Sequence, residues 1–436
     1  MSLSRRFLLR ASVILPVAPL GASADVPALQ RSLGITAQAG ISPTQLAADQ
    51  RYWSAVAGLY DLTDDVVNLE NGYWGAMARP VLADYQRHSA EVNRGNAWYG
   101  RMRYPADYEA VRARTAVALG VETDEIVLTR GATEALQALI SGYNRLVPGD
   151  TVLCADTDYD SMINAMRWLK QRRGVEVIRI NLPEPATHAS LIDTYAQAIE
   201  RNPKLKVILL THVNHRNGMV LPVAEIARMA RKHGVDVIVD AAHSVGQLDF
   251  RIPDLQADFV GINLHKWIGA PVGVGALYIK RGRVGSIDPY MGERGGDDVR
   301  TRVHTGTANF AAYLALPMAL DLHAQIGAAN KQARLQRLRN RWVEAARGIE
   351  GIELLASDDP RLTSAISSFR LRGRNTLAEN VALSKRLLNE SKVFTIHRDG
   401  LASGACVRVT PSVFTSEAQI DQFILALYKL TGQTAA

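Results

Sequence analysis

Lys266 stands in an otherwise apolar, glycine-rich run of the sequence, GINLHKWIGAPVGVGALYIK, which spans residues 261–280. A lysine in apolar surroundings loses its proton more readily than a lysine in water, and the neutral amine is a nucleophile toward aldehydes. The alternative is a lysine whose alkyl chain is buried while its charged head stays in solvent. Taken in isolation, Lys266 favours this second interpretation.

Other groups with chemical potential follow other apolar runs. Asp240 directly ends VDVIVD, and a buried carboxylate needs a partner, although Asp240 could also cap a following helix. LTRGATEAL places Gly131, Ala132 and Thr133 at an expected helix start, where free N–H groups and a hydroxyl form an anion site, or where Thr133 acts only as a cap. Tyr159, in ADTDYDSM, could lie flat on a planar ring or simply lie at the surface.

These groups together match what pyridoxal phosphate needs from a protein. Its phosphate needs backbone donors, its pyridinium nitrogen needs a carboxylate that keeps it protonated, and its aldehyde needs an amine for a Schiff base. The order of the groups along the chain therefore favours Lys266 as a cofactor lysine over a solvent-exposed one.

The elements that must position these groups form an α/β pattern. Seven β-rich runs between about residue 125 and residue 280 are mostly separated by helical patterns, which predicts a largely parallel sheet with helices on both faces. The last two runs, ADFVGIN and GALYIK, leave no room for a helical crossover, so we expect them to pair antiparallel. Ligands of such sheets bind at the carboxyl ends of the strands, where the groups above lie.

A second, smaller α+β domain is expected after about residue 315, where a long basic amphipathic helix precedes shorter strands. The expected organisation is a signal over residues 1–24, a linker over 25–42, the N-terminal part of the small domain over 43–75, the large cofactor-binding domain over 76–315, and the small C-terminal domain over 316–436.

Residues 1–24 have the composition of an export signal: a basic start, the apolar stretch ASVILPVAPLG, and small residues before Asp25. The pair Arg5 and Arg6 matches the twin-arginine pattern, with an ordinary secretory signal as the alternative. We therefore expect the protein to be exported folded by the twin-arginine translocation (Tat) machinery and to be periplasmic. The apolar stretch is too short for a stable membrane anchor.

The overall composition excludes several classes of protein. Of the formal net charge of +7, three positive charges lie before Asp25, so the mature chain carries about +4, with no basic stripe of the kind nucleic-acid binders show. Cys154 and Cys406 are the only cysteines, so no disulfide framework is expected. Neither a nucleic-acid partner nor a metal site is expected. A nicotinamide-dependent enzyme is disfavoured because no strand is followed by a G-x-G-x-x-G fingerprint.

Over essentially the whole chain after residue 24, the sequence resembles the class V aminotransferases, which are pyridoxal-phosphate enzymes of fold type I. The motifs that carry the resemblance are GATEAL, DAAHSVG, NLHK and the late RVT. LENGYWGAMARP and THVNHRNGMVLPV make it most similar to the isopenicillin N epimerase-like branch. The implied fold is a seven-stranded, mostly parallel sheet in a large domain, plus a smaller α+β domain.

The resemblance also implies roles for particular residues. Lys266 is the implied Schiff-base lysine, Asp240 the pyridinium partner, and Tyr159 the stacking ring. The implied phosphate and ring contacts are Gly131, Ala132, Thr133, Asn214, His215, His243 and His265, with Thr307 reaching the phosphate of a neighbouring subunit in a homodimer. Arg408 in CVRVT is the implied fork for a substrate carboxylate.

Further substrate contacts are expected from Asn71 in LENGYWG and from the segment GNAWYGRMRYP. In that segment Trp98, Tyr99, Arg101 and Arg103 are candidates for the pocket, and an ordinary packed loop is the alternative.

Two residues depart from the family pattern. Relatives commonly have Gln at the position of His243 and Ser or Asn at that of His215, so two titratable imidazoles lie where acid or base catalysis at the substrate α-carbon takes place. Cysteine desulfurases of this family need a cysteine on a mobile loop well before the carboxylate arginine. The corresponding stretch, KVFTIHRDGLASGA, has none, so desulfurase activity is disfavoured and Cys406 is expected to be a packing residue.

The expected function is a periplasmic enzyme that forms a Schiff base with an amino acid or an aminoacyl side group and carries out transamination, epimerisation or decarboxylation. Its substrate is expected to be a small amino acid, a peptide or a siderophore precursor, because the signal together with this fold resembles enzymes that modify the glutamate side group of pyoverdine-type siderophores. The alternative is a catalytically silent protein of the cell envelope that binds or senses a ligand.

Overall fold

The structure is a computed structural model, and it describes residues 40–434. The expected signal, residues 1–24, and most of the expected linker, residues 25–42, lie outside the described residues. No helix within the described range is long and apolar enough to cross a membrane.

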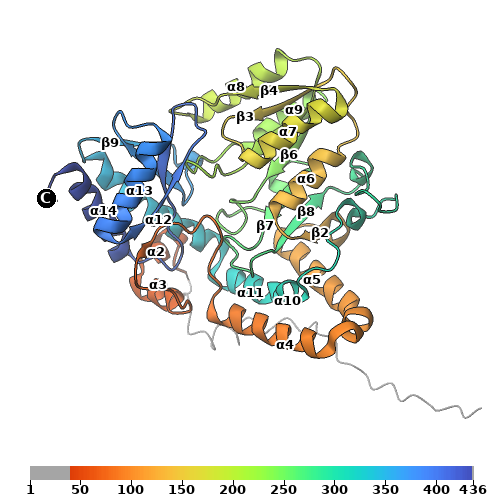
Figure 1. The fold of residues 1–436 in the computed structure, drawn as a ribbon, viewed down its shortest axis with the longest axis horizontal. Coiled ribbons are helices and arrows are strands. Elements are labelled where there is room, and N and C mark those ends of the chain that lie inside the picture. Colours follow the sequence, from red (N-terminus) through yellow and green to blue (C-terminus); the bar gives the residue numbers. More distant parts are fainter. Residues whose placement is uncertain (1–39, 435–436) are drawn as a thin grey trace, which may run out of the picture.

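A seven-stranded sheet forms the centre of the larger part of the molecule, in the order β2-β8-β7-β6-β5-β3-β4 (Figure 1). Only β8 runs antiparallel to its neighbours, and its pairing with β7 confirms the antiparallel pair expected at the end of the series. The predicted α/β fold with a mostly parallel seven-stranded sheet is therefore confirmed. The strands are β2 (Ile126–Thr129), β3 (Thr151–Ala155), β4 (Glu176–Ile180), β5 (Leu205–Thr211), β6 (Asp236–Asp240), β7 (Phe259–Asn263) and β8 (Gly275–Ile279).

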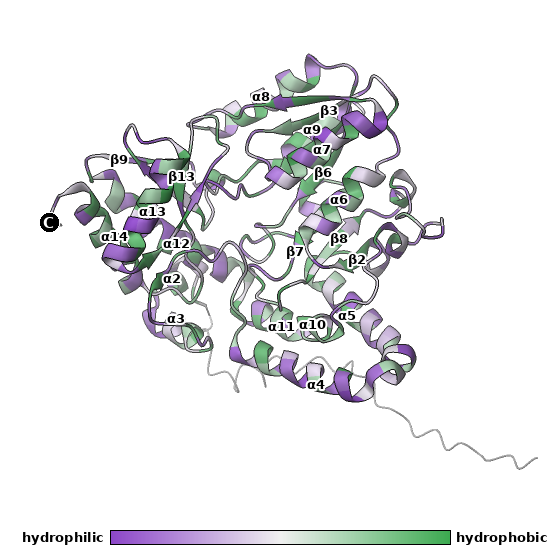
Figure 2. Ribbon diagram, in the orientation of Figure 1, coloured by the Kyte–Doolittle hydropathy of each residue, from purple (hydrophilic) through white to green (hydrophobic). Residues whose placement is uncertain are grey.

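Alternate residues of these strands pack into two separate hydrophobic cores, because successive side chains of a strand point to opposite faces. Leu153 and Ile208 lie in the core beneath α5, α8, α9 and α11, whereas Val152 and Leu209 lie in the core beneath α6 and α7. Both faces are thus buried, and the central strands are coloured as hydrophobic in Figure 2. The helices of this part are α4 (Arg79–Met102), α5 (Tyr104–Leu119), α6 (Ala132–Gly142), α7 (Asp160–Arg173), α8 (His188–Glu200), α9 (Val223–Lys232), α10 (Phe310–Leu314) and α11 (Leu316–Ile326).

A second sheet, in the order β12-β13-β10-β9, lies in the C-terminal part of the chain. It packs on α12 and α14 through a core centred on Trp342, which contacts Phe369 and Phe423 edge-on. The strands are β9 (Ile352–Leu354), β10 (Ser367–Leu371), β11 (Val393–Phe394), β12 (Ile396–Arg398) and β13 (Cys406–Val409), and the helices are α12 (Ala328–Arg347), α13 (Leu377–Ser391) and α14 (Glu417–Thr431).

The N-terminal described segment joins this C-terminal part, and Figure 1 shows its red helices beside the blue ones. The short strand β1 (Val67–Asn68) pairs in parallel with β11, and α2 (Pro43–Ala48) packs on α12. Helix α3 (Gln50–Ala57) follows α2 directly. The 3-10 helices are η1 (Thr123–Glu125), η2 (Ile252–Leu255), η3 (Val284–Ser286), η4 (Val299–Arg302) and η5 (Pro360–Leu362). The domain limits expected from the sequence stay predictions.

Candidate active site

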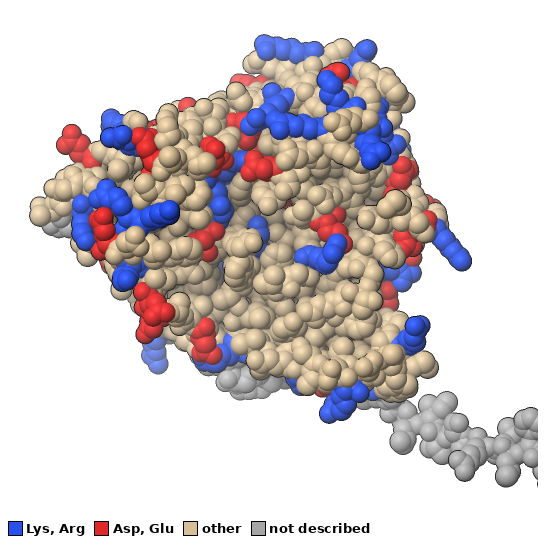
Figure 3. Space-filling view, viewed as in Figure 1, with Lys and Arg blue, Asp and Glu red and all other residues tan. Residues whose placement is uncertain are grey.

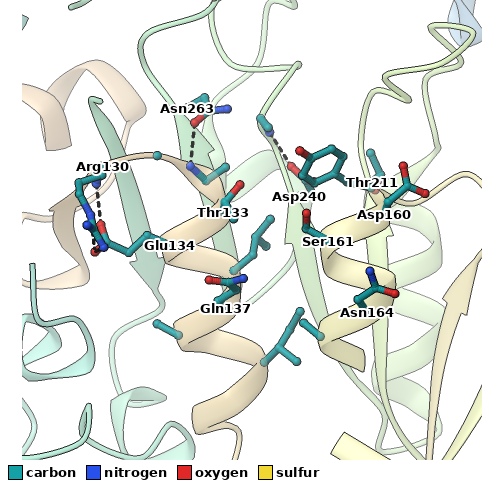
Figure 4. A pocket seen from close by; sticks show the side chains of 18 of the residues that line it. Arg130, Thr133, Glu134, Gln137, Asp160, Ser161, Asn164, Thr211, Asp240 and Asn263 are labelled. Atoms are coloured by element: carbon teal, nitrogen blue, oxygen red, sulfur yellow. Dashed lines mark hydrogen bonds and ion pairs between the residues drawn. The ribbon is translucent and has the colours of Figure 1, made fainter. Parts of the chain in front are cut away.

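A cavity of about 1530 Å³ opens at the carboxyl ends of the parallel strands and reaches the second sheet. On the face seen in Figure 3, acidic and basic side chains are interspersed. Figure 4 shows part of the cavity wall: Thr133 and Gln137 from α6 face Ser161 and Asn164 from α7, and Asp240 and Asn263 lie at the strand ends above them. The cavity lies where open parallel sheets bind ligands.

Lys266 lines this cavity three residues beyond the end of β7. Its Nζ lies 2.9 Å from His243 Nε2. Burial lowers the pKa of Lys266 to about 7; the nearby Asp240 opposes this shift, and Arg408 adds to it. Near neutral pH the Lys266 amine is therefore unprotonated in about half of the protein molecules, and only the unprotonated amine is a nucleophile.

Asp240 is the last residue of β6 and only 4% exposed. Its Oδ1 accepts a hydrogen bond of 2.9 Å from the backbone N–H of Ala242, and burial raises its pKa. The next helical element is η2, which begins twelve residues further on, so Asp240 does not cap a helix. Its carboxylate is left to face the cavity, where it can hold a cationic ring nitrogen.

The first turn of α6 forms another part of the wall. Gly131 is its N-cap residue, and a Cβ there would lie 2.9 Å from Asn263 Oδ1 and 3.2 Å from His265 Cε1, so the backbone closes tightly on these two side chains. The N–H of Ala132 donates to Asn263 Oδ1 at 2.7 Å and is therefore occupied. Thr133 follows in the first turn, where backbone N–H groups have no partner within the helix, so an anion would be held mainly there.

Tyr159 and His215 form the opposite side. Tyr159 precedes α7 and is 40% exposed, and its ring contacts that of His215 edge-on with centroids 5.3 Å apart. His215 is buried and its Nδ1 has no hydrogen-bond partner among the described residues. The pKa values of His215 and His243 are well below the usual value, chiefly because both are buried and secondly because of Arg216 and Lys266 respectively. Burial also lowers the pKa of His265.

Arg408 reaches the cavity from β13 and is 1% exposed. Its Nη1 donates to the carbonyl of His215 at 2.8 Å, and its guanidinium pairs with Glu70. Burial lowers the pKa of Arg408 to about 10, which leaves it charged at neutral pH. A carboxylate from solvent can therefore meet a cation here.

Several expected contacts do not line this cavity. The amide of Asn214 donates to Thr157 O, and that of Asn71 donates to Asn68 O and Thr410 O, so both are tied to the backbone. Thr307 is exposed and also lies outside the cavity wall. The roles predicted for these residues stay predictions.

The segment 95–105 is not the packed loop that was one of its two expected forms. It forms the end of α4, which is kinked at Asn96 with a φ of 46°, and the start of α5. Trp98 and Arg101 lie on this helix outside the cavity wall, and Tyr99 donates to Asp107. The sequence was misleading because Gly95, Asn96 and Gly100 are residue types typical of turns. In the structure only Asn96 departs from helical backbone angles, and the helix continues on both sides of this kink.

Glu70 and Asn263 are two residues of the site that the sequence did not predict. The signal for Glu70 was its place next to Asn71 in LENGYWG, but nothing local shows that its partner Arg408 comes 338 residues later. Asn263 ends an apolar strand, and only the fold reveals that it reaches the first turn of α6.

These residues fit pyridoxal phosphate. A lysine with a depressed pKa, a buried carboxylate, a helix start closed by glycine, an aromatic ring and an unpartnered imidazole nitrogen surround one cavity. Each supplies a kind of contact that one part of the cofactor requires.

Comparisons with known proteins agree with this chemistry. The family model described as "Aminotransferase class-V" matches residues 79–423. An isopenicillin N epimerase from Streptomyces clavuligerus is 27% identical over 87% of this chain and 99% of its own length, and a probable cysteine desulfurase from Xylella fastidiosa is 27% identical over 79% and 85%. Among solved structures, the cysteine desulfurase CsdA from Escherichia coli superposes with a TM-score of 0.74 at 21% identity, covering 88% of this chain and 99% of its own. The predicted resemblance to this family and to isopenicillin N epimerases is confirmed.

The prediction that disfavoured cysteine desulfurase is wrong. Probable cysteine desulfurases from several organisms are among the relatives, and cysteine desulfurases are among the matching structures. The inference rested on the lack of cysteine in residues 392–405, which include β11 and β12, and one such stretch is too little to separate activities that share a fold and a cofactor.

Proposed function

Because this chain belongs to the class V aminotransferase family, whose cofactor is pyridoxal phosphate, we propose that it acts on the amino group of an amino acid or of an aminoacyl side group. The observation that carries the proposal is the position of Lys266, whose amine has a pKa of about 7 in the same cavity as Asp240 and Arg408. The cofactor, when bound, accepts electron density from the substrate α-carbon.

The residues of the chain divide the work between them. Lys266 provides the amine that holds the cofactor, Asp240 keeps the ring nitrogen protonated, and the first turn of α6 at Thr133 holds the phosphate. Tyr159 limits the space over the ring, and Arg408 orients the substrate carboxylate.

His243 and His215 are placed to move protons. His243 Nε2 lies 2.9 Å from Lys266 Nζ, so a proton can pass between these two groups without a change in the fold. Both imidazoles are neutral near pH 7 and can accept a proton from the substrate α-carbon region. Transamination and epimerisation need a proton taken from the α-carbon, whereas decarboxylation needs a proton delivered to it after CO2 has left; we propose one of these three as the outcome.

Cleavage of a carbon–sulfur bond in a cysteine-type substrate is a second candidate. It is supported by several relatives that are probable cysteine desulfurases and by a matching structure of a cystine C–S lyase, with a TM-score of 0.72. An assay for alanine, sulfide and pyruvate with L-cysteine and L-cystine would separate this outcome from transamination, which yields an oxoacid from many amino acids.

We also propose that the protein is exported to the periplasm and acts there on a peptide or siderophore precursor. The proposal is supported by the twin-arginine pattern at Arg5 and Arg6. Replacing both arginines with lysine should retain a fused folded reporter in the cytoplasm, and a reporter that is still exported would contradict the Tat route.

The first test is the visible absorption spectrum of the protein incubated with pyridoxal phosphate, compared with that of a Lys266→Ala variant, each with and without borohydride. We expect a band in the parent that borohydride bleaches and that is absent in the variant. Lys331→Ala is a matched control, because Lys331 is also a buried lysine with a pKa of about 7 but does not line the cavity. No bound chromophore in the parent would overturn the proposal and favour a protein that only binds a ligand.

A further inference from the structure

The guanidinium of Arg408 is already paired within the chain. Glu70 accepts from Arg408 Nε at 3.3 Å and also from Nη2, and Arg398 Nη2 lies 3.2 Å from the same carboxylate. The side chains of Arg408 and Glu70 are 1% and 8% exposed. Two arginines therefore share one buried carboxylate at the edge of the cavity.

Part of Arg408 remains available to a ligand. A guanidinium has five N–H donors, and three are used: two by Glu70 and one by the carbonyl of His215. A Cβ on Gly72 would lie 2.8 Å from Arg408 Nη2 and 2.9 Å from Cζ, so the backbone of Gly72 lies directly against the guanidinium. The group is thus fixed in place, with about two donors that no residue in the described range 40–434 uses.

The charges of this cluster decide which anion fits. Arg398 and Arg408 line the cavity, whereas Glu70 lies behind them and does not. Two cations and one carboxylate leave a net charge of +1, which one substrate carboxylate neutralises. Without Glu70 the net charge of the cluster would be +2, which suits a dicarboxylate. The repulsion between Glu70 and a second substrate carboxylate would also be gone.

We infer that Glu70 is a specificity-determining residue that adapts the arginine pair to substrates with a single free carboxylate near the reacting amine. The inference rests on the proposed function, in which Arg408 binds the substrate carboxylate. Glu70 acts through the arginines and does not touch the substrate itself. The preferred class is thus an amino acid or aminoacyl group with one carboxylate in this part of the cavity.

The test is calorimetric binding of propionate and of succinate to the cofactor-loaded protein and to a Glu70→Gln variant, which keeps the size and an acceptor oxygen. We expect the parent to bind the two acids with affinities within about threefold, and Glu70→Gln to bind succinate at least about tenfold more tightly than propionate, since a unit charge is removed from a largely buried site. An unchanged ratio in Glu70→Gln, or a tenfold preference for succinate already in the parent, would overturn the inference.

Two further variants make the outcome specific. Glu353→Gln removes a carboxylate that pairs with Arg370 between neighbouring strands of the same sheet but outside the cavity, and it should leave the ratio unchanged. If Glu70→Gln does not fold, Arg398→Gln tests the same charge balance. In that variant Arg408 and Glu70 leave a net charge of zero, so propionate should bind about tenfold more weakly than to the parent. Propionate affinity that is unchanged in Arg398→Gln would then contradict the inference.

Failure of this inference differs from failure of the proposed function. The ratio of the two carboxylate affinities reports on the arginine pair, while the borohydride-sensitive band reports on Lys266. A protein with the band but with no effect of Glu70→Gln retains the proposed function and loses only the specificity role.

Discussion

The pKa of Lys266 predicts at which pH the protein captures its cofactor. With a pKa of about 7, about half of the Lys266 side chains are neutral at pH 7, compared with about one in 3,000 for an ordinary lysine. Because only the neutral amine attacks an aldehyde, we expect the rate of attachment to cofactor-free protein to rise between about pH 6 and about pH 8 and then to level off.

Two substitutions should move this profile in opposite directions. Asp240 raises the pKa of Lys266 and Arg408 lowers it. Asp240→Asn should therefore shift the midpoint to lower pH and Arg408→Gln to higher pH, each by about one unit for a charge at close range in a largely buried site.

The assay follows the visible band after rapid mixing of cofactor-free protein with pyridoxal phosphate over a range of pH. The same reaction with N-acetyl-lysine methylamide gives the contribution of the free aldehyde, and division by that rate isolates the titration of the protein. A midpoint above about pH 9, where an ordinary lysine begins to titrate, would refute the reasoning. So would a profile that neither substitution moves.

Three other outcomes follow from the structure. Burial depresses the pKa of Lys331 to about 7, so between about pH 7 and about pH 10 the unfolded chain binds more protons than the folded protein does. The free energy of unfolding of the cofactor-free protein should therefore rise with pH over this range. Lys331→Met, which also loses the hydrogen bond to Trp267 O, should reduce that rise, as measured by denaturant titration at several pH values. Gly131→Ala brings a Cβ to 2.9 Å from Asn263 Oδ1 and should weaken cofactor affinity at least about tenfold in equilibrium titration; unchanged affinity would mean that the helix start does not hold the phosphate. Trp342→Ala empties the centre of the C-terminal core and should lower the free energy of unfolding by about 3–5 kcal/mol, measured by urea denaturation; a loss below about 1 kcal/mol would mean that the core closes over the gap.

The large sheet could be predicted because its strands are long apolar runs with clear interruptions. Strand β9, only Ile352–Leu354, could not, since three residues carry no usable periodicity. The same limit explains why β1 appeared in the sequence only as part of a longer N-terminal segment.

The cofactor end of the site was accessible from sequence because each group lies at the end of a strand or within a few residues of it. Lys266 and Asp240 come at strand ends, and the topology of a parallel sheet brings such ends together. Glu70 and Asn263 were not accessible, because a single polar residue does not reveal a partner that lies 338 or 131 positions away. Sequence therefore indicated the chemistry, whereas the charge balance around the carboxylate site depends on the fold.

That charge balance links substrate binding to proton transfer. Arg408 contributes to the depressed pKa values of His215, His243 and Lys266, because a buried positive charge disfavours a second one nearby. A substrate carboxylate that binds Arg408 cancels part of this field and so raises the proton affinity of both imidazoles and of the amine. The histidines thus become stronger bases when a substrate with the correct carboxylate is present. Glu70, which already offsets part of the charge of Arg408, sets how large this change can be.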